Sequence, residues 1–200
     1  MSGVQQMKFE MLNEITKFAA IKATGALSKI LELPIGVDII PVEKKRLDEI
    51  QTTMKAEEKI VGLTVPIMDP LPGTCLLIYP ETAALSICDT MFHRKEGETK
   101  KFNEMEVSAL TEIANIVIGN FLTSFAIPLQ IDALLHRAAR FNRNNFADFF
   151  EEISVGLAEN IENGLIVELA FYFQHIKIHG IAIFLFDEKS IAAALNKVGS

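Results

Sequence analysis

Apolar residues along this chain gather in runs that follow the same order in each half. Two short, almost wholly apolar runs open at Gly73 and Gly180, and each closes at a residue followed by glutamate. Runs of this length and composition are typical of buried strands that lead into helices. The pattern predicts these strands and helices at 73–79, 81–91, 179–186 and 188–198.

A longer repeat surrounds these runs. Glu14-Ile15 and Glu112-Ile113 each begin a helical pattern that ends close to a proline, Pro34 or Pro128. The glutamates are 98 residues apart and the prolines 94. A difference of four residues is about one helical turn, so the first helix should be one turn longer. The remaining strands are predicted at 35–43, 59–68, 128–140 and 164–176, with an extra helix at about 146–160.

Each half therefore reads as helix, three strands and helix, which predicts an α/β fold with pseudo-two-fold symmetry. We expect one domain over residues 1–200, in which the two halves share a sheet. The first repeat is placed at about 8–92 and the second at about 103–198. Between them, residues 93–102 are charged and lack apolar periodicity, which predicts a solvated linker.

Composition narrows the function classes. Half of the residues are hydrophobic, which favours a large core, and the net charge of −7 disfavours nucleic acid as a partner. Cys75 and Cys88 lie in apolar surroundings and are expected to be reduced core residues. The start of the chain has no pattern of a leader peptide, which favours a cytoplasmic location. The uncharged stretch 113–131 contains several polar residues, so we expect a buried helix and strand there rather than a membrane span.

One helix face carries candidate chemistry. Ser108, Glu112 and Asn115 are spaced by four and then three residues, which places them on one face of a helix. Gly119 continues this stripe and would leave room beside Asn115. By spacing alone, the simpler interpretation is a solvated helix face.

Other patterns point to little chemistry. His175 and His179 would lie roughly 13 Å apart on an extended strand, too far to share a metal ion, so no metal site is predicted. The basic segment from His136 to Arg143 is typical of a strand end and loop, with a docking surface as the alternative. The sequence contains no phosphate-binding glycine loop, GxSxG motif or Cys/His dyad.

The segment Glu104 to Asn120 resembles the second helix of the CheC/CheX/FliY chemotaxis phosphatases, most of all CheC. In that family an active helix carries Asp or Ser, then Glu four residues later and Asn three further on, with a proline about twenty residues beyond. The first helix, with Ala26-Leu27-Ser28 after Glu14, is similar to the family's first helix. The resemblance covers nearly the whole chain. It implies a CheC-like domain with a largely antiparallel sheet and two long helices that carry the site positions.

The resemblance implies a phosphatase that hydrolyses the aspartyl-phosphate of a CheY-like response regulator. Asn115 would orient the attacking water, and Glu112 would pair with the regulator's phosphate-site lysine. Ser108 and Gly119 would support the docking surface. The regulator would bring the acyl phosphate and Mg²⁺, so no cofactor of this chain's own is expected.

The chain departs from the family pattern in two places. The first helix has Glu10, Glu14 and Lys17 at the matching positions, and lysine offers no acceptor. Glu14 and Lys17 are expected to form an ordinary surface pair, which leaves a degenerate first site and a single working site on the second helix. The family's proline is also missing, because His136, Arg137 and Ala138 stand about twenty residues after Asn115.

These departures leave an alternative function open. A non-catalytic adaptor could bind a response regulator, or the receptor deamidase CheD, without turnover. A FliY-type flagellar role is not expected, because that resemblance would call for an additional C-terminal domain. We expect a monomer, since the internal duplication supplies the symmetry that a homodimer would otherwise provide.

Overall fold

The computed structural model describes residues 3–39, 43–46, 49, 55–157, 163–173 and 176–198. The elements of the first half are α1 (Gly3–Leu31), β1 (Ile35–Ile39), β2 (Glu43–Arg46), β3 (Lys59–Ile67), β4 (Gly73–Pro80) and α3 (Glu81–Met91). Those of the second half are α4 (Glu104–Ala126), β5 (Arg140–Asn145), α5 (Phe146–Leu157), β6 (Asn163–Phe173), β7 (Ile176–Asp187) and α6 (Glu188–Val198).

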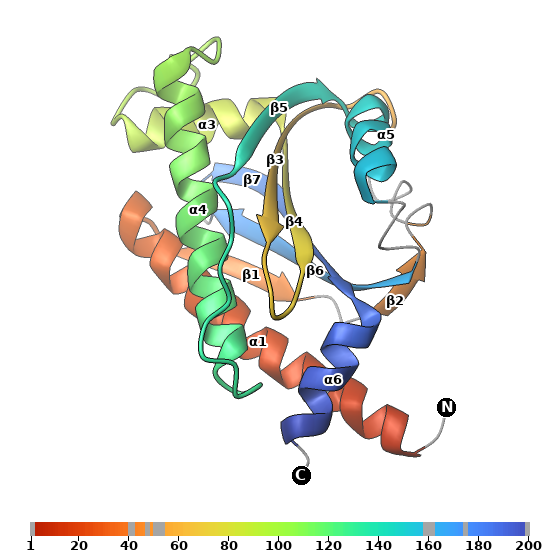
Figure 1. Cartoon of the computed structure of the whole chain (residues 1–200). Coiled ribbons are helices and arrows are strands. Elements are labelled where there is room, and N and C mark those ends of the chain that lie inside the picture. The colour runs from red at the N-terminus through yellow and green to blue at the C-terminus, as the bar shows by residue number, and fades with distance from the viewer. Residues whose placement is uncertain are drawn as a thin grey trace.

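The described strands form one antiparallel sheet in the order β1-β6-β7-β4-β3-β5, and β2 also pairs with β6 (Figure 1). If each strand is exchanged for its counterpart in the other half, the same order is read in reverse. The central pair β4–β7 places Leu76 opposite Ile183, and these two residues are equivalent in the repeat. This register is the one that a two-fold axis through the sheet requires. The sheet is therefore consistent with the duplication.

Close packing around this axis repeats in the two halves. A Cβ on Gly180 would lie 2.3 Å from the Tyr79 ring, and one on Gly73 would lie 3.1 Å from the Phe186 ring. Tyr79 is the last residue of the apolar run of β4, and Phe186 is the last residue of the apolar run of β7. In each half the glycine that opens the central run lies against the aromatic ring that closes the other run, which leaves no room for a larger residue at Gly180.

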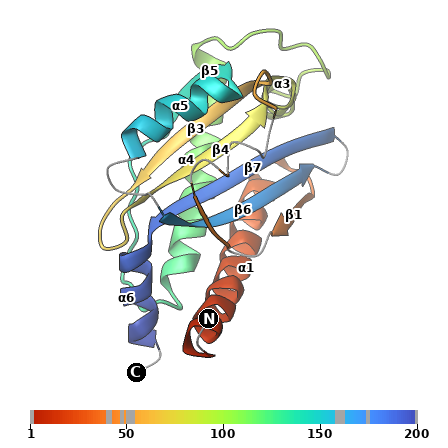
Figure 2. The same ribbon diagram turned by 90° about the vertical axis from the view of Figure 1, so that its right-hand side faces the viewer.

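Alternate residues of the central strands face two separate cores. The main core lies between the sheet and the helices α1 and α4, which pack side by side. A smaller core lies on the other face, where Phe146, Phe149 and Phe150 of α5 cover residues of β3, β4 and β7. Figure 2 shows α5 in front of the sheet and the two long helices behind it. The strands thus hold α4 on a rigid platform.

Aromatic contacts position α4 on this platform. The ring centroids of Phe121 and Phe184 lie 3.9 Å apart, and those of Phe125 and Phe186 lie 5.3 Å apart. By length and composition α4 could also cross a membrane, but 56% of its apolar window is buried inside the fold. The expected helix at 113–126 is therefore a core helix.

The prediction of a strand at 128–140 is wrong. Residues 127–139 contain turns and one isolated bridge, and β5 begins only at Arg140. Pro66 of β3 has no N–H to give to a neighbouring strand, and the N–H of Ala139 donates to the Asn115 side chain instead of to the ladder. Residues 128–139 therefore cannot form the full ladder of hydrogen bonds to β3 that a continuous strand would need.

The prediction that residues 93–102 form a solvated linker is wrong in part. Arg94 pairs with Glu106 of α4 at 2.7 Å, and Glu106 is 2% exposed. Asp89 accepts hydrogen bonds from the N–H groups of Gly97 and Thr99, both at 2.7 Å. These bonds attach residues 94–99 to α3 and α4. The boundaries of the two repeats, about 8–92 and 103–198, stay predictions.

Candidate functional site

The polar stripe of α4 faces away from the core, as the spacing predicted. Ser108 and Glu112 are exposed, while Asn115 and Gly119 are partly exposed. The opposite side of the helix, including Leu110, Ile113 and Phe121, is buried. Within the described residues, the side chains of Ser108 and Glu112 make no hydrogen bond or ion pair. They are therefore available to a partner.

The chain that follows α4 returns along this helix. We call residues 127–139 the return segment; Figure 1 shows it running beside α4 up to β5. Three backbone hydrogen bonds to Ala126 and Ile127 form the turn that reverses the chain. Two further bonds, from Met68 N–H to Leu135 O and from Arg137 N–H to Pro66 O, both 2.9 Å, attach the segment to the end of β3. The segment is thus fixed on the sheet beside the polar stripe.

The return segment contacts two residues of the stripe. Asn115 Oδ1 accepts a hydrogen bond of 3.0 Å from the N–H of Ala139. This bond sets the orientation of the amide and leaves its NH₂ group free to donate elsewhere. His136 fills the room that was expected beside Gly119, because a Cβ at Gly119 would lie 3.3 Å from His136 Nε2. The site is thus a helix face completed by a neighbouring segment.

The matching stripe of α1 is built differently. Glu10, Glu14 and Lys17 are exposed, and Lys17 Nζ lies 2.6 Å from Glu14 Oε1. This confirms the predicted surface pair. Only residues 32–34 separate α1 from β1, so no return segment lies along this helix. That the first site is inactive stays a prediction.

The basic segment from His136 to Arg143 ends in an ion pair. Arg143 donates from Nε and one terminal nitrogen to the two carboxylate oxygens of Glu81, both at 2.8 Å. The hydrogen bond from Arg143 lowers the pKa of Glu81. The segment is a loop followed by a strand, the reverse of the expected strand end and loop, and Arg137 and Arg140 remain exposed.

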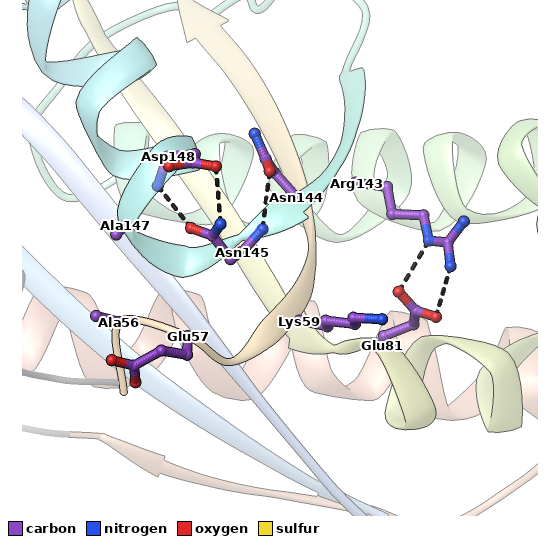
Figure 3. A pocket seen from close by; sticks show the side chains of 9 residues that line it. All are labelled: Ala56, Glu57, Lys59, Glu81, Arg143, Asn144, Asn145, Ala147 and Asp148. Carbon is purple, nitrogen blue, oxygen red and sulfur yellow. Dashed lines mark hydrogen bonds and ion pairs between the residues drawn. The ribbon is translucent and has the colours of Figure 1, made fainter.

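The same ion pair borders a cleft of about 630 Å³ that the sequence did not reveal (Figure 3). Its residues come from the start of β3, the start of α3 and the β5–α5 junction: Ala56, Glu57, Lys59, Glu81, Arg143, Asn144, Asn145, Ala147 and Asp148. Its acidic and basic groups stand close together, and Arg143 is already paired with Glu81. No lining residue belongs to α4, so the cleft is separate from the stripe.

Outside the stripe, little in the described residues supports a nucleophilic cysteine or a metal site. Cys75 and Cys88 are free and buried, as predicted, and burial raises the pKa of Cys88 to about 12. In the part of the chain that the structure describes, no three His, Cys, Asp or Glu residues are grouped as metal ligands. His175 lies outside the described residues, so the separation of His175 and His179 stays a prediction.

Part of the chain, including the candidate site, is similar in sequence to known proteins. A family model for the CheC-like family matches residues 105–131, which include most of α4 and the start of the return segment. CheC1 of Halobacterium salinarum, provisionally named a CheY-P phosphatase, is 22% identical over 119 residues; the match spans 60% of this chain and 60% of the relative. Both matches support a relationship between this chain and the CheC-like family.

Solved structures show the fold of this family along nearly the whole chain. FliY of Thermotoga maritima superposes with a TM-score of 0.78 at 19% identity, and the match covers 99% of this chain and 98% of FliY. FliM from a FliG–FliM complex of H. pylori gives 0.66 at 14% identity, covering 96% and 100%. CheX of Vibrio vulnificus gives 0.56 at 15% identity, covering 88% and 97%. The expected CheC-like fold, with its antiparallel sheet and long helices, is confirmed.

Two parts of this CheC-like site could not be found as such from the sequence. The N–H of Ala139 is a backbone donor, and every residue type except proline has one. His136 was noted in the sequence as a departure from the family's proline and as the start of a basic segment, but not as a neighbour of α4. Gly119 was the one signal that a neighbour approaches the helix.

Proposed function

We propose that this protein hydrolyses the aspartyl-phosphate of a CheY-like response regulator at a single site on α4. The observation that carries the proposal is Asn115, an amide on an exposed helix face whose orientation is set by the Ala139 N–H. Phosphoryl transfer requires mainly a well-placed nucleophile and charge stabilisation. The partner regulator would supply the Mg²⁺, and Asn115 would hold the water in line with the phosphorus.

The other stripe residues have supporting roles in this proposal. Glu112 is exposed and, within the described residues, unpaired, so it is available for the lysine of the regulator's phosphate site. Ser108 lies one turn before it at the edge of the docking surface. The exposed Arg137 and Arg140 can meet acidic groups of the regulator. The cytoplasmic location, the monomeric state and any binding of CheD belong to the same proposal.

The test is the decay of a CheY-like regulator from the same genome, phosphorylated with acetyl phosphate in the presence of Mg²⁺. Wild-type protein should accelerate the decay, and Asn115→Ala should lower kcat by about 100-fold, because the water loses its orienting group. Asn120→Ala is the matched control: it removes the same amide from the same helix, where the side chain is exposed and bonds to the Ile116 carbonyl. Circular dichroism checks folding, since Asn115→Ala leaves the Ala139 N–H unpaired.

The adaptor is the rival function. It is supported by His136, which occupies the room beside Gly119 where a partner group could otherwise enter. Binding of the regulator with no acceleration of its decay would establish the adaptor and overturn the phosphatase. Equal decay with wild type and Asn115→Ala would place any hydrolysis elsewhere in the molecule.

A further inference from the structure

His136 is held in a fixed position next to the proposed site. Hydrogen bonds on both sides of it attach the return segment to Pro66 and Met68, and His136 itself lies opposite Ile67. Because these bonds flank the Ile67–His136 pair, they fix the backbone at His136 beside β3. The imidazole then lies against Gly119, one helical turn beyond Asn115.

The hydrogen bonding of the ring determines which nitrogen is free. His136 Nδ1 lies 2.9 Å from the carbonyl oxygen of Arg137. A carbonyl can only accept, so Nδ1 carries the hydrogen and donates it. In the neutral ring, Nε2 then holds the lone pair. Nε2 is also the atom that faces α4 at Gly119.

We propose that His136 Nε2 is the proton acceptor for the water that Asn115 orients; this rests on the phosphatase function proposed above. In the reaction, the water oxygen forms a bond to phosphorus while the bond from phosphorus to the aspartyl oxygen breaks. The electron pair of that bond returns to the regulator's carboxylate. One proton of the water passes to Nε2 and then to solvent, which leaves inorganic phosphate as the product.

The geometry explains why this chain can do without the family's proline. Asn115 can orient a water but cannot take its proton, because an amide is not a base at neutral pH. An imidazole against Gly119, one helical turn beyond Asn115, would supply that capacity. Glycine at position 119 allows this approach, since a Cβ there would lie 3.3 Å from His136 Nε2 and would shift the ring. In the region where the family has a proline, this chain thus has an imidazole that can accept a proton.

The experiment compares His136→Ala, His136→Gln and His136→Pro with wild type in the same decay assay, and measures kcat and KM separately. His136→Pro introduces the residue type that the family carries about twenty residues after its Asn, and the hydrogen bonds to β3 involve the neighbours of His136 and not the His136 N–H. All three variants should lower kcat by about 10- to 100-fold, at or below the low end for general-base catalysis, because the transition state of phosphoryl transfer is loose. KM for the phosphorylated regulator should change by less than about twofold, since His136 acts on the water.

Added imidazole distinguishes catalysis from packing. The space left by His136→Ala beside Gly119 should admit free imidazole, which should restore at least about a third of the lost log-rate. Asn115→Ala should not respond to imidazole, because its defect is orientation. A structural role for His136 would not predict this difference.

Three outcomes overturn the proposal. If Asn115→Ala abolishes turnover while the His136 variants keep the wild-type kcat, the phosphatase function stands and the role of His136 is lost. If His136→Ala is faster than wild type, the ring obstructs the site. If wild type binds the regulator without accelerating its decay, the phosphatase function and the role of His136 fail together.

Discussion

The two long helices occupy equivalent places in the two halves, but their connections differ. Residues 32–34 join α1 directly to β1, whereas residues 127–139 return along α4 before β5 begins. The α4 stripe therefore receives a backbone donor and an imidazole from outside the helix, and the α1 stripe pairs with itself through Glu14 and Lys17. Equivalent stripes on the two helices thus meet different neighbours, and only the stripe of α4 lies against a second segment of the chain.

The buried sides of the helices differ as well. α1 presents Ala19, Ala20 and Ala23 where α4 presents Val117, Ile118 and Phe121 at the matching positions. Small residues allow α1 to approach its neighbours closely, while the aromatic rings of α4 stack on β7. The helix that carries the candidate site, α4, is thus the one whose aromatic side chains stack on the sheet.

The largest expected effect comes from removing such a contact. Phe121→Ala should lower the free energy of unfolding by about 3–5 kcal/mol, because it leaves a cavity beneath α4. Urea denaturation measures this, with Ile21→Ala on α1 as the control. Ile21 is 61% exposed, so the control should change stability by less than about 0.5 kcal/mol. A Phe121→Ala loss below about 1 kcal/mol would contradict the role given to the stack.

The start of α4 offers the next test. Glu106 accepts hydrogen bonds from Arg94 and from the N–H of Asn103, and the bond from Arg94 lowers the pKa of Glu106. Glu106→Gln should lower the free energy of unfolding at pH 7 by about 2 kcal/mol. Glu104→Gln, at an exposed position of the same first turn, is the matched control and should have a smaller effect.

The pH dependence of that difference has a definite sign. Because the folded-state pKa of Glu106 is below its ordinary value, its contribution to stability is complete above about pH 4.5. The contribution is lost as the pH falls through the lowered pKa. Wild type and Glu106→Gln should therefore converge in acid, as measured by denaturation at pH 7 and pH 3. A constant gap between the two proteins would exclude this ion pair as the cause.

A substitution with a smaller expected effect makes the two halves more alike at one position. The Tyr79 hydroxyl is buried and, within the described residues, has no hydrogen-bond partner, while its counterpart in the repeat is Phe186. Tyr79→Phe should raise the free energy of unfolding by about 1 kcal/mol, because it removes an unpaired polar group. Differential scanning calorimetry should show a higher Tm. A lower Tm would mean that the hydroxyl has a partner.

The smallest expected change tests the comparison itself. Lys17→Asn restores the family's amide on α1 and breaks an exposed ion pair, which should alter stability by less than about 0.5 kcal/mol. In an Asn115→Ala background it should restore no phosphatase activity, because α1 has no return segment. Recovery of activity in the regulator-decay assay would show that the helix motif alone is sufficient.

Much of the fold could be predicted because hydrophobic patterns and turn residues repeat in the sequence. The runs at Gly73 and Gly180 give β4 and much of β7 with the helices that follow, and α1 extends about one turn further beyond Glu14 than α4 does beyond Glu112. The failures lie where a side chain overrides the local pattern. Pro66 and Asn115 together interrupt the expected strand at 128–140, and Arg94 attaches a polar linker to a buried glutamate.

The candidate site shows the same limit. Spacing placed Ser108, Glu112, Asn115 and Gly119 on one exposed face, which the structure contains. It could not show what lies against that face, because the contact joins Asn115 to a residue 24 positions away through a backbone group. Long-range contacts of this kind depend on the path of the whole chain, which local periodicity does not encode.

The order of the strands has a consequence for how such a protein arises. β1 pairs with β6 and β5 pairs with β3, so each half contributes its first strand to the hairpin of the other. A gene for one half alone would encode a chain that completes its sheet only by exchanging strands with a second copy. In such a homodimer every mutation would alter both sites at once. In a single chain the two halves can differ, and here the first helix carries Lys17 at the position where the second carries Asn115.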